Sequence, residues 1–235
     1  MCVHPTITEI QPGSPDCTTL RDTAKQLDRG GAIRASGAYR HAMAITFHCR
    51  CGTLRGEIES RDIYARATCY CRDCQAFART LGREDVLDAQ GGTDIVAMLP
   101  AGVHFTDGFD RLACLSLGPK GLLRWHSRCC DAPIANTVRD PKLAYVGVLC
   151  LQGDALDAAV GPSRIALNAK SARGQVSPTP LRTFVGVIRI MRGVLAARLR
   201  GRHRDNPFFD AATSRPVAEP RVLTRQERTD AERAQ

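Results

Sequence analysis

The sequence has few aromatic residues, no long apolar run and no recognisable export signal. Aromatic side chains make up 5% of the 235 residues, with a single tryptophan, so we expect a core built mainly from valine, leucine, isoleucine and alanine. No segment approaches the roughly 18 consecutive apolar residues of a membrane span, and the first 30 residues lack an apolar signal core. The hydrophobic fraction of 43% and the charged fraction of 24% are ordinary for a globular chain. We therefore expect a cytoplasmic globular protein, and not a collagen, a coiled coil or a disordered chain.

Two motifs that often identify enzymes are also missing. The sequence contains no glycine-rich loop of the kind that cradles nucleotide phosphates. It contains no arrangement of serine, histidine and aspartate that is typical of hydrolases. Nucleotide-dependent chemistry and serine-hydrolase chemistry are therefore disfavoured.

Cysteine, by contrast, is abundant. The chain has 11 cysteines, an odd number, and without an export signal a disulfide framework is disfavoured. Closely spaced thiolates converge readily on a soft cation, and Zn²⁺ is the usual one. Buried structural cysteines have no reason to cluster, yet seven of the 11 form three tight groups: Cys49 and Cys51; Cys69, Cys71 and Cys74; Cys129 and Cys130. The other four are expected in the core or in a tail: Cys2, Cys17, Cys114 and Cys150.

The seven clustered thiols divide naturally into four and three. Four ligands close a structural zinc site, whereas three leave a position open for water or substrate. The pairs at 49–51 and 129–130 are far apart in the sequence and can staple two segments together, which leaves the triplet at 69–74 as the candidate open site. A single zinc ion with spare thiols, or a dinuclear cluster, also fits this count.

The pattern along the chain predicts a β domain between two unlike ends. Residues 1–42 show little periodicity and predict a poorly ordered extension, and Met43 is a candidate start of the folded protein or of translation. Short runs separated by turns predict an all-β module, with a zinc-binding β domain over 43–180 and a C-terminal segment over 181–235. The predicted strands span 44–48, 54–58, 63–68, 94–99, 111–116, 121–126 and 132–138, with a short helix over 75–81.

The C-terminal segment has a different pattern. It carries 12 arginines and six acidic residues, and so holds most of the net charge of +9. One interpretation is a helix docked through its apolar face with its arginines in solvent, and this is the commoner case. The other is that residues 182–204 bind nucleic acid or an anionic membrane surface. The remainder, from Asn206 onward, is expected to lie extended along the surface. Apolar residues at helical spacing predict an amphipathic helix over 181–204: Phe184, Ile188, Met191, Leu195 and Leu199.

Three stretches resemble the glutathione-dependent formaldehyde-activating enzyme family, which is often grouped with centromere protein V. They are 47–52 with the pattern C-x-C-G, 69–75 with C-x-C-x-x-C, and 125–136. The resemblance covers roughly residues 43–150 and is greatest to a bacterial branch of the family. It implies a mainly β, Mss4-like or β-tent fold with two zinc ions, Cys49 and Cys51 in a structural site, and Cys69, Cys71 and Cys74 in a catalytic site. It also implies a carbon–sulfur lyase-type activity that joins glutathione, a small thiol, to formaldehyde.

The sequence departs from the family's pattern at two positions. The family has a later C-x-x-C-G-x-P pair, whereas residues 126–133 read HSRCCDAP. Aligning on the proline makes Cys130 one ligand, leaves Ser127 in place of the other, and predicts Cys129 as the fourth thiol, with His126 as the alternative. Adjacent cysteines can share one ion only across a tight bend. Tyr70 stands where the family often has histidine, so one candidate proton carrier is absent.

The residues beside the triplet have alternative roles. Arg72 can balance thiolate charge or hold a substrate carboxylate, although an exposed arginine is the commoner case. Asp73 is expected to cap a helix, and Tyr70 to pack in the interior. Two other functions fit the same residues: a non-catalytic zinc module that binds partners through its C-terminal helix, and a redox sensor whose triplet releases zinc on oxidation.

Overall fold

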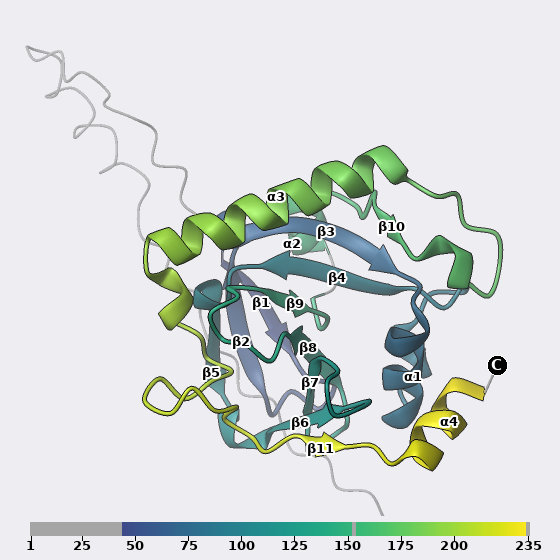
Figure 1. Cartoon of the computed structure of the whole chain (residues 1–235), viewed down its shortest axis with the longest axis horizontal. Helices are drawn as coiled ribbons and strands as arrows, with labels where there is room; N and C mark the ends of the chain where they lie inside the picture. The colour runs from purple at the N-terminus through teal and green to yellow at the C-terminus, as the bar shows by residue number, and fades with distance from the viewer. Residues whose placement is uncertain (1–43, 152–153, 234–235) are drawn as a thin grey trace, which may run out of the picture. The chain divides into compact units, whose positions relative to one another are not determined.

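The computed structural model describes residues 44–151 and 154–233 (Figure 1). These residues belong to one compact unit that spans 41–235. The extension predicted over 1–42, the proposed start at Met43, and Cys2 and Cys17 all lie outside the described residues. Residues 181–235 belong to the same compact unit as the predicted β domain.

The strands form two sheets. In the smaller sheet, β2 lies between β1 and β5 and pairs antiparallel with both. The larger sheet has the order β10-β3-β4-β9-β8-β7-β6-β11; its two outermost strands pair in parallel with their neighbours and the others pair antiparallel. The strands are β1 Ala44–His48, β2 Arg55–Glu59, β3 Ile63–Cys69, β4 Thr93–Met98, β5 Val103–Asp107, β6 Leu112–Ser116, β7 Leu123–Ser127, β8 Pro133–Thr137, β9 Val146–Val148, β10 Ala166–Leu167 and β11 Arg221–Val222.

A continuous apolar core connects the two sheets. Side chains alternate between exposed and buried along β1, so that Ile45 and Phe47 face inward, as expected for a strand with one covered face. They share one cluster with Trp125 and Ile134 of the larger sheet. Trp125 is fully buried, and its Nε1 donates to Thr137 Oγ1 at 3.0 Å, which satisfies the indole N–H. The prediction of a mainly β fold is confirmed.

Helices cover the edges and one end of the larger sheet. The first of them, α1, begins at Arg72, earlier than the predicted 75, because the ligand loop itself caps it. It packs against α4 at the end of the chain. Six α-helices and strands have no counterpart among the predicted elements: α2, α4, β5, β9, β10 and β11. The helices are α1 Arg72–Thr80, α2 Asp154–Val160, α3 Pro180–Leu199 and α4 Arg225–Arg233, with short 3-10 helices η1 Ser60–Asp62, η2 Glu84–Val86, η3 Pro100–Gly102, η4 Phe109–Arg111, η5 Ala169–Ser171 and η6 Arg202–Arg204.

The segment after α3 is not a surface tail, contrary to the prediction from the sequence. Phe208 is fully buried in the main core and lies against Trp125 and Phe105, with ring centroids 5.2 and 5.6 Å away. The chain then adds β11 in parallel to β6. Prolines punctuate this segment, but its paired aromatic residues bury enough apolar surface to hold it in the interior.

The long helix α3 is confirmed as a helix, but the predicted docking face is wrong. It packs along β3 (Figure 1) through a row of mostly small residues. Gly186 and Ala197 are buried, and a Cβ on Gly193 would lie 2.3 Å from the Tyr64 ring. The predicted apolar face points the other way and is exposed. A helix with little side-chain bulk on one face can approach a sheet closely, and here that close packing decides the orientation. Among the described residues, none of the helices combines the length and apolarity needed to cross a bilayer.

Replacing Gly193 by alanine is expected to destabilise the protein by about 1–3 kcal/mol, since the new methyl group would overlap the Tyr64 ring. The ring is held in place because Tyr64 Oη donates to the carbonyl oxygen of Ala144 at 3.1 Å. The higher helix propensity of alanine acts in the opposite direction by about 1 kcal/mol. Urea unfolding followed by circular dichroism measures the difference. In a Tyr64→Leu background the same change should cost nothing; equal stability of Gly193→Ala and wild type would contradict this packing.

Candidate metal centres

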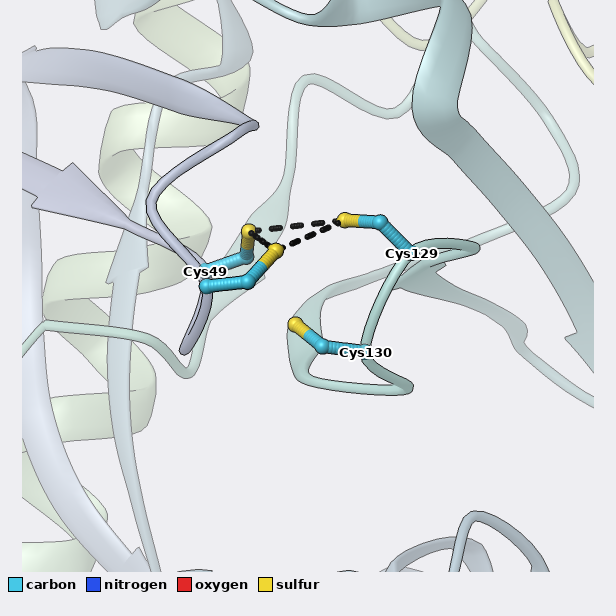
Figure 2. A group of neighbouring side chains, drawn as sticks. Cys49, Cys129 and Cys130 are labelled. Atoms are coloured by element: carbon cyan, nitrogen blue, oxygen red, sulfur yellow. Dashed lines mark hydrogen bonds between the residues drawn. The ribbon is translucent and has the colours of Figure 1, made fainter.

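Four thiols from two distant segments meet at one point (Figure 2). Cys49 and Cys51 come from the turn after β1, and Cys129 and Cys130 from the turn between β7 and β8. All four Sγ atoms lie within 4.8 Å of one another. The Sγ atoms of Cys49 and Cys51 are 3.4 Å apart, and that of Cys129 lies 3.7 Å from Cys49 and 3.2 Å from Cys51.

The backbone of both turns produces this convergence. Gly52 adopts a left-handed conformation with φ +73°, which closes the first turn and leaves the amide of Leu54 to donate to Cys49 Sγ at 3.3 Å. In the second turn Asp131 adopts φ +51°, an unusual value that aspartate tolerates better than most residues. Its amide donates to the carbonyl oxygen of Ser127 at 2.9 Å. This is the tight bend that two adjacent cysteines require.

The four thiols fit a tetrahedral metal ion. Zinc–sulfur bonds of about 2.3 Å place tetrahedral sulfur atoms about 3.8 Å apart, close to the separations found here. The contact of Cys51 with the Thr53 hydroxyl, at 3.3 Å, lowers the pKa of this thiol to about 6, because a hydroxyl stabilises the thiolate. His126 is not part of the group; it lies 3.6 Å from Asp131. Ser127 is fully buried; its Oγ accepts from the amide of Ala132 at 3.0 Å and lies 3.3 Å from Cys130 Sγ, so it supports the turn beside the ligand thiols.

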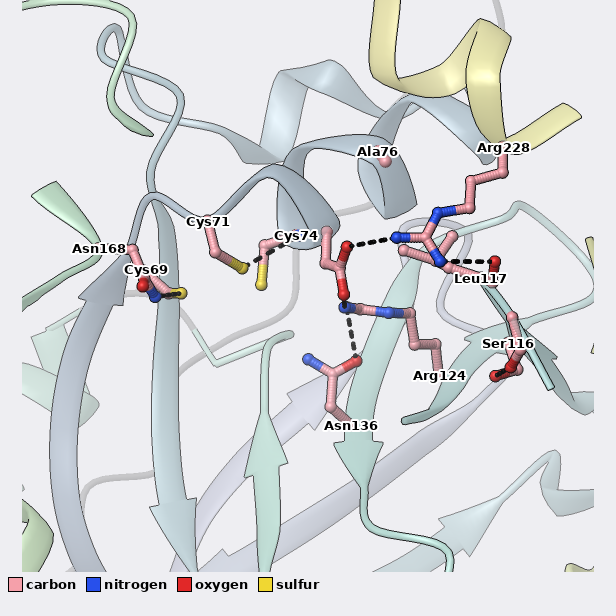
Figure 3. Close-up of polar contacts among 12 residues, drawn as sticks. Cys69, Cys71, Cys74, Ala76, Ser116, Leu117, Arg124, Asn136, Asn168 and Arg228 are labelled. Atoms are coloured by element: carbon pink, nitrogen blue, oxygen red, sulfur yellow. Dashed lines mark hydrogen bonds and ion pairs between the residues drawn. The ribbon is translucent and has the colours of Figure 1, made fainter. Parts of the chain in front are cut away.

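The second group consists of three thiols at the junction of a strand and a helix (Figure 3). Cys69 is the last residue of β3, Cys71 is the N-cap of α1, and Cys74 lies in its first turn. Their Sγ atoms also lie within 4.8 Å of one another. Cys71 Sγ accepts from the amide of Cys74 at 3.4 Å, so the thiols lie where the helix N-terminus offers free amides and positive potential.

The pKa shifts within the triplet indicate that its three thiols cannot all ionise without added positive charge. Hydrogen bonds from Cys71 and Cys74 lower the pKa of Cys69, because they stabilise its thiolate. The contacts among the three thiols raise the pKa of Cys74, because its ionisation would place a second negative charge beside the Cys69 thiolate. A cation is what allows all three thiols to ionise together. Burial raises the pKa of Tyr145 to about 12, and the charges of Cys74 and Cys69 act on it in the same direction.

Two residues that the sequence reasoning missed hold the triplet in place. Asn168, in a left-handed conformation with φ +55°, donates from Nδ2 to Cys69 Sγ at 3.6 Å. The pairing of β10 with β3 brings it there across 99 residues of sequence. Gln75 is buried and donates to the carbonyl oxygens of Tyr70 and Ser171 at 2.9 and 3.0 Å. An asparagine between two short elements is the sequence signal for such a left-handed position.

Of the residues beside the triplet, Asp73 does not have the role predicted from the sequence, whereas Arg72 and Tyr70 do. Asp73 does not cap α1, because Cys71 does; its carboxylate instead lies 3.9 Å from Arg124 and 3.5 Å from Arg228 (Figure 3). Arg124 is buried, donates to Asn136 Oδ1 at 3.3 Å and lies over the Phe77 ring. Arg72 is exposed, as the commoner interpretation has it. Tyr70 is buried, and its hydroxyl donates to Asp88 at 3.1 Å.

A cavity of about 430 Å³ is lined by residues that neighbour the thiols in the chain or in the core, although none of the seven clustered thiols lines it. Leu149 lines it and also packs in the apolar cluster that contains Cys69 and Cys74. Arg50, next to the four-thiol group, lines it as well. Arg83 also lines the cavity, but it is paired with Asp85 at 2.7 and 2.8 Å. Within the described part of the chain, Arg50 has no ion-pair partner, so the cavity carries uncompensated positive charge.

Fold and site together define a mainly β protein with two cysteine groups that could hold metal ions. The chain belongs to a protein family described as a family of unknown function, DUF6151, which matches residues 42–221. It is similar to a protein of Rhodobacter sphaeroides known from a crystal structure, with 19% identity, 53% of this chain and 100% of that chain covered, and a TM-score of 0.36. None of the curated proteins matches the chain.

Proposed function

We propose that the protein binds two zinc ions, one structural and one catalytic, and joins a small thiol such as glutathione to formaldehyde or a similar aldehyde. The observation that carries this proposal is the division of seven thiols into a group of four and a group of three. It accords with the resemblance of the C-x-C-G and C-x-C-x-x-C stretches to glutathione-dependent formaldehyde-activating enzymes. The assignment of zinc follows from the all-sulfur ligand sets.

The four-thiol group has the composition of a structural site. Four protein ligands leave no position for substrate. Its ligands cross-link the turn after β1 to the turn between β7 and β8, which are 78 residues apart at Cys51 and Cys129. Its proposed role is to hold the smaller sheet against the larger one.

The triplet has the composition of a catalytic site, because three protein ligands leave one position open. A zinc ion bound there would supply positive charge that favours a substrate thiolate and polarises a carbonyl oxygen. In the proposed reaction the thiol sulfur attacks the aldehyde carbon, and one carbon–sulfur bond forms as the carbonyl π bond breaks. The thiol proton ends on the former carbonyl oxygen, so the product is a hemithioacetal, S-hydroxymethylglutathione when the reactants are glutathione and formaldehyde, and no further reactant is consumed.

The residues around the triplet have separate roles in this proposal. Asn168 and Gln75 hold the ligand loop in one geometry through their hydrogen bonds. Arg50, which lines the cavity beside the four-thiol group, is the proposed contact for a carboxylate of the thiol substrate. Tyr145, whose hydroxyl stays protonated at neutral pH, is the candidate donor of a hydrogen bond to the developing alkoxide. It takes the place of the histidine that the family often has at position 70.

The variant Cys69→Ser/Cys71→Ser is expected to keep its fold, to lose one of two zinc ions and to lose the activity. Exchange between free formaldehyde and S-hydroxymethylglutathione, measured by exchange NMR with labelled formaldehyde, reports the rate. Wild-type protein should accelerate this exchange above the spontaneous rate, and the double variant should return it to that rate. Metal content is measured on the same samples by elemental analysis.

Cys114→Ala is the matched control, because Cys114 is a buried cysteine outside both groups. It should retain two zinc ions and the full exchange rate. One zinc ion in both wild type and double variant would mean that the triplet holds no metal, and the catalytic role would be wrong. Two zinc ions without any acceleration would leave the metal sites standing and reject the thiol–aldehyde reaction.

A further inference from the structure

The outer face of α3 is a continuous apolar stripe in solvent. Leu181, Phe184, Met191, Leu195 and Leu199 are 74%, 63%, 62%, 58% and 79% exposed. With about 100° per residue, these positions fall on one side of the helix, opposite the small residues that pack on β3. An exposed apolar patch on a helix 20 residues long is a common mark of an interaction surface.

The charges around this stripe are of one sign. From 180 to 204 the chain has seven arginines and no acidic residue. Arg192 and Arg198 lie at the margins of the apolar stripe by the same helical periodicity. Within the described residues, neither of them forms an ion pair. Arg202, after the helix, pairs with Asp62, whereas the other six arginines form no ion pair among the described residues. The surface therefore combines apolar side chains with uncompensated positive charge along the helix.

A groove beside α3 also combines apolar walls with arginine side chains. It has a volume of about 470 Å³, with apolar walls that include Leu181, Val185 and Ile165. Arg164, Arg182 and Arg189 line it, and the described part of the chain supplies no carboxylate to any of the three. Guanidinium groups above apolar walls suit an anionic phosphate headgroup joined to a hydrocarbon chain.

We infer that α3 is a membrane-interface helix, which lies in the plane of an anionic lipid surface with its apolar stripe in the acyl region. The flanking arginines contact phosphate headgroups, and the small-residue face holds the β domain above the surface. This inference is independent of the proposed zinc chemistry, since neither thiol group contributes to the stripe.

A second copy of the chain fits this face less well. The spacing of the stripe is also that of a helical pair, but such pairs gain specificity from opposite charges at their margins. Two copies of α3 would bring only arginines together. A polynucleotide would satisfy the arginines but would leave the apolar stripe in water. The anionic bilayer is the partner that accommodates both features.

Co-sedimentation of the full-length protein with lipid vesicles tests the inference. We expect binding to phosphatidylcholine vesicles that contain phosphatidylglycerol, and at least tenfold weaker binding to phosphatidylcholine alone. Each arginine near the surface strengthens binding about fivefold, so Arg192→Gln/Arg198→Gln should weaken it about 25-fold. Met191→Ser/Leu195→Ser should weaken it at least tenfold, and Phe184→Trp should give a blue-shifted emission on vesicles.

The matched control is Leu122→Ser/Val222→Ser, which replaces residues 39% and 43% exposed on the side of the larger sheet that lies away from α3. It should bind vesicles as wild type does, and circular dichroism melting should show that all variants are folded. Vesicle binding that survives Met191→Ser/Leu195→Ser would overturn the inference. So would a dimer without vesicle binding that this variant converts to monomer, or binding to a polynucleotide without binding to vesicles.

Discussion

The variant Cys51→Ser is expected to lose one of the two proposed zinc ions and, with it, most of the stability of the fold. Cys51 belongs to the group that joins two turns whose cysteines are 78 residues apart. Structural zinc binds small peptides with apparent free energies of about 10–16 kcal/mol, comparable to the total stability of about 5–15 kcal/mol of an ordinary domain. A loss of even about 3 kcal/mol lowers the Tm by roughly 10 °C in a chain of this size.

The measurement combines elemental analysis with thermal melting, each with and without a strong chelator. Cys69→Ser/Cys71→Ser is the comparison, because its ligands lie within one short loop and cross-link nothing distant. It should lose the other zinc ion while its Tm stays close to that of wild type. If Cys51→Ser retained two zinc ions, or melted as wild type does, the four-thiol group would not be a structural site.

The grouping of the thiols was accessible from the sequence because close spacing is a local property. Cys69, Cys71 and Cys74 are brought together by one strand end and one helix start, which the sequence places next to each other. The pairs at 49–51 and 129–130 are far apart in the sequence. Their convergence could still be predicted, because a closed zinc site has four ligands and these two pairs supply four thiols. The tight bend at the adjacent cysteines depends on the left-handed conformation of Asp131, which follows them.

The neighbours of the triplet were not accessible in the same way. Asn168 reaches Cys69 only because a two-residue strand, β10, pairs in parallel with β3. A strand of two residues is too short to show an alternation of apolar and polar side chains, and its pairing depends on the whole sheet. Tyr145 follows an irregular turn 71 residues after Cys74, and the thiol charges act on its pKa only because the fold brings the two segments near each other. The composition of the site could be predicted, whereas its surroundings depend on long-range contacts.

The orientation of α3 shows a limit of hydrophobic periodicity. The rule that the apolar stripe of a helix faces the core predicts burial of Phe184 and Leu195, yet both are exposed. The buried face contains Gly186 and Gly193, whose hydrogens let the helix approach Ile165 and Tyr64 closely. Glycine contributes little to a hydrophobic pattern, so the docking face is invisible to that pattern. The exception is informative, because an exposed apolar stripe is a common mark of an interaction surface.

The burial of Phe208 leads to the second large prediction. Phe208→Ala is expected to cost about 3–5 kcal/mol, since it removes a fully buried ring from the core and leaves a cavity. The ring contacts Trp125 and Phe105, so it fastens the C-terminal segment to both sheets. We expect the Tm to fall by roughly 10–20 °C, while elemental analysis of the folded protein still gives the wild-type metal content.

Phe184→Ala provides the matched control, because it removes the same side chain from a position that is 63% exposed. Its effect on stability should stay within about 0.5 kcal/mol. Urea unfolding of both variants separates a core role from a general effect of losing an aromatic residue. Equal, small losses would mean that the segment from Asn206 onward is the surface tail that its prolines indicate. A large loss at Phe208 alone would show that the β domain needs its last 30 residues or so to complete its core, and that a fragment ending at α3 cannot have the stability of the whole chain.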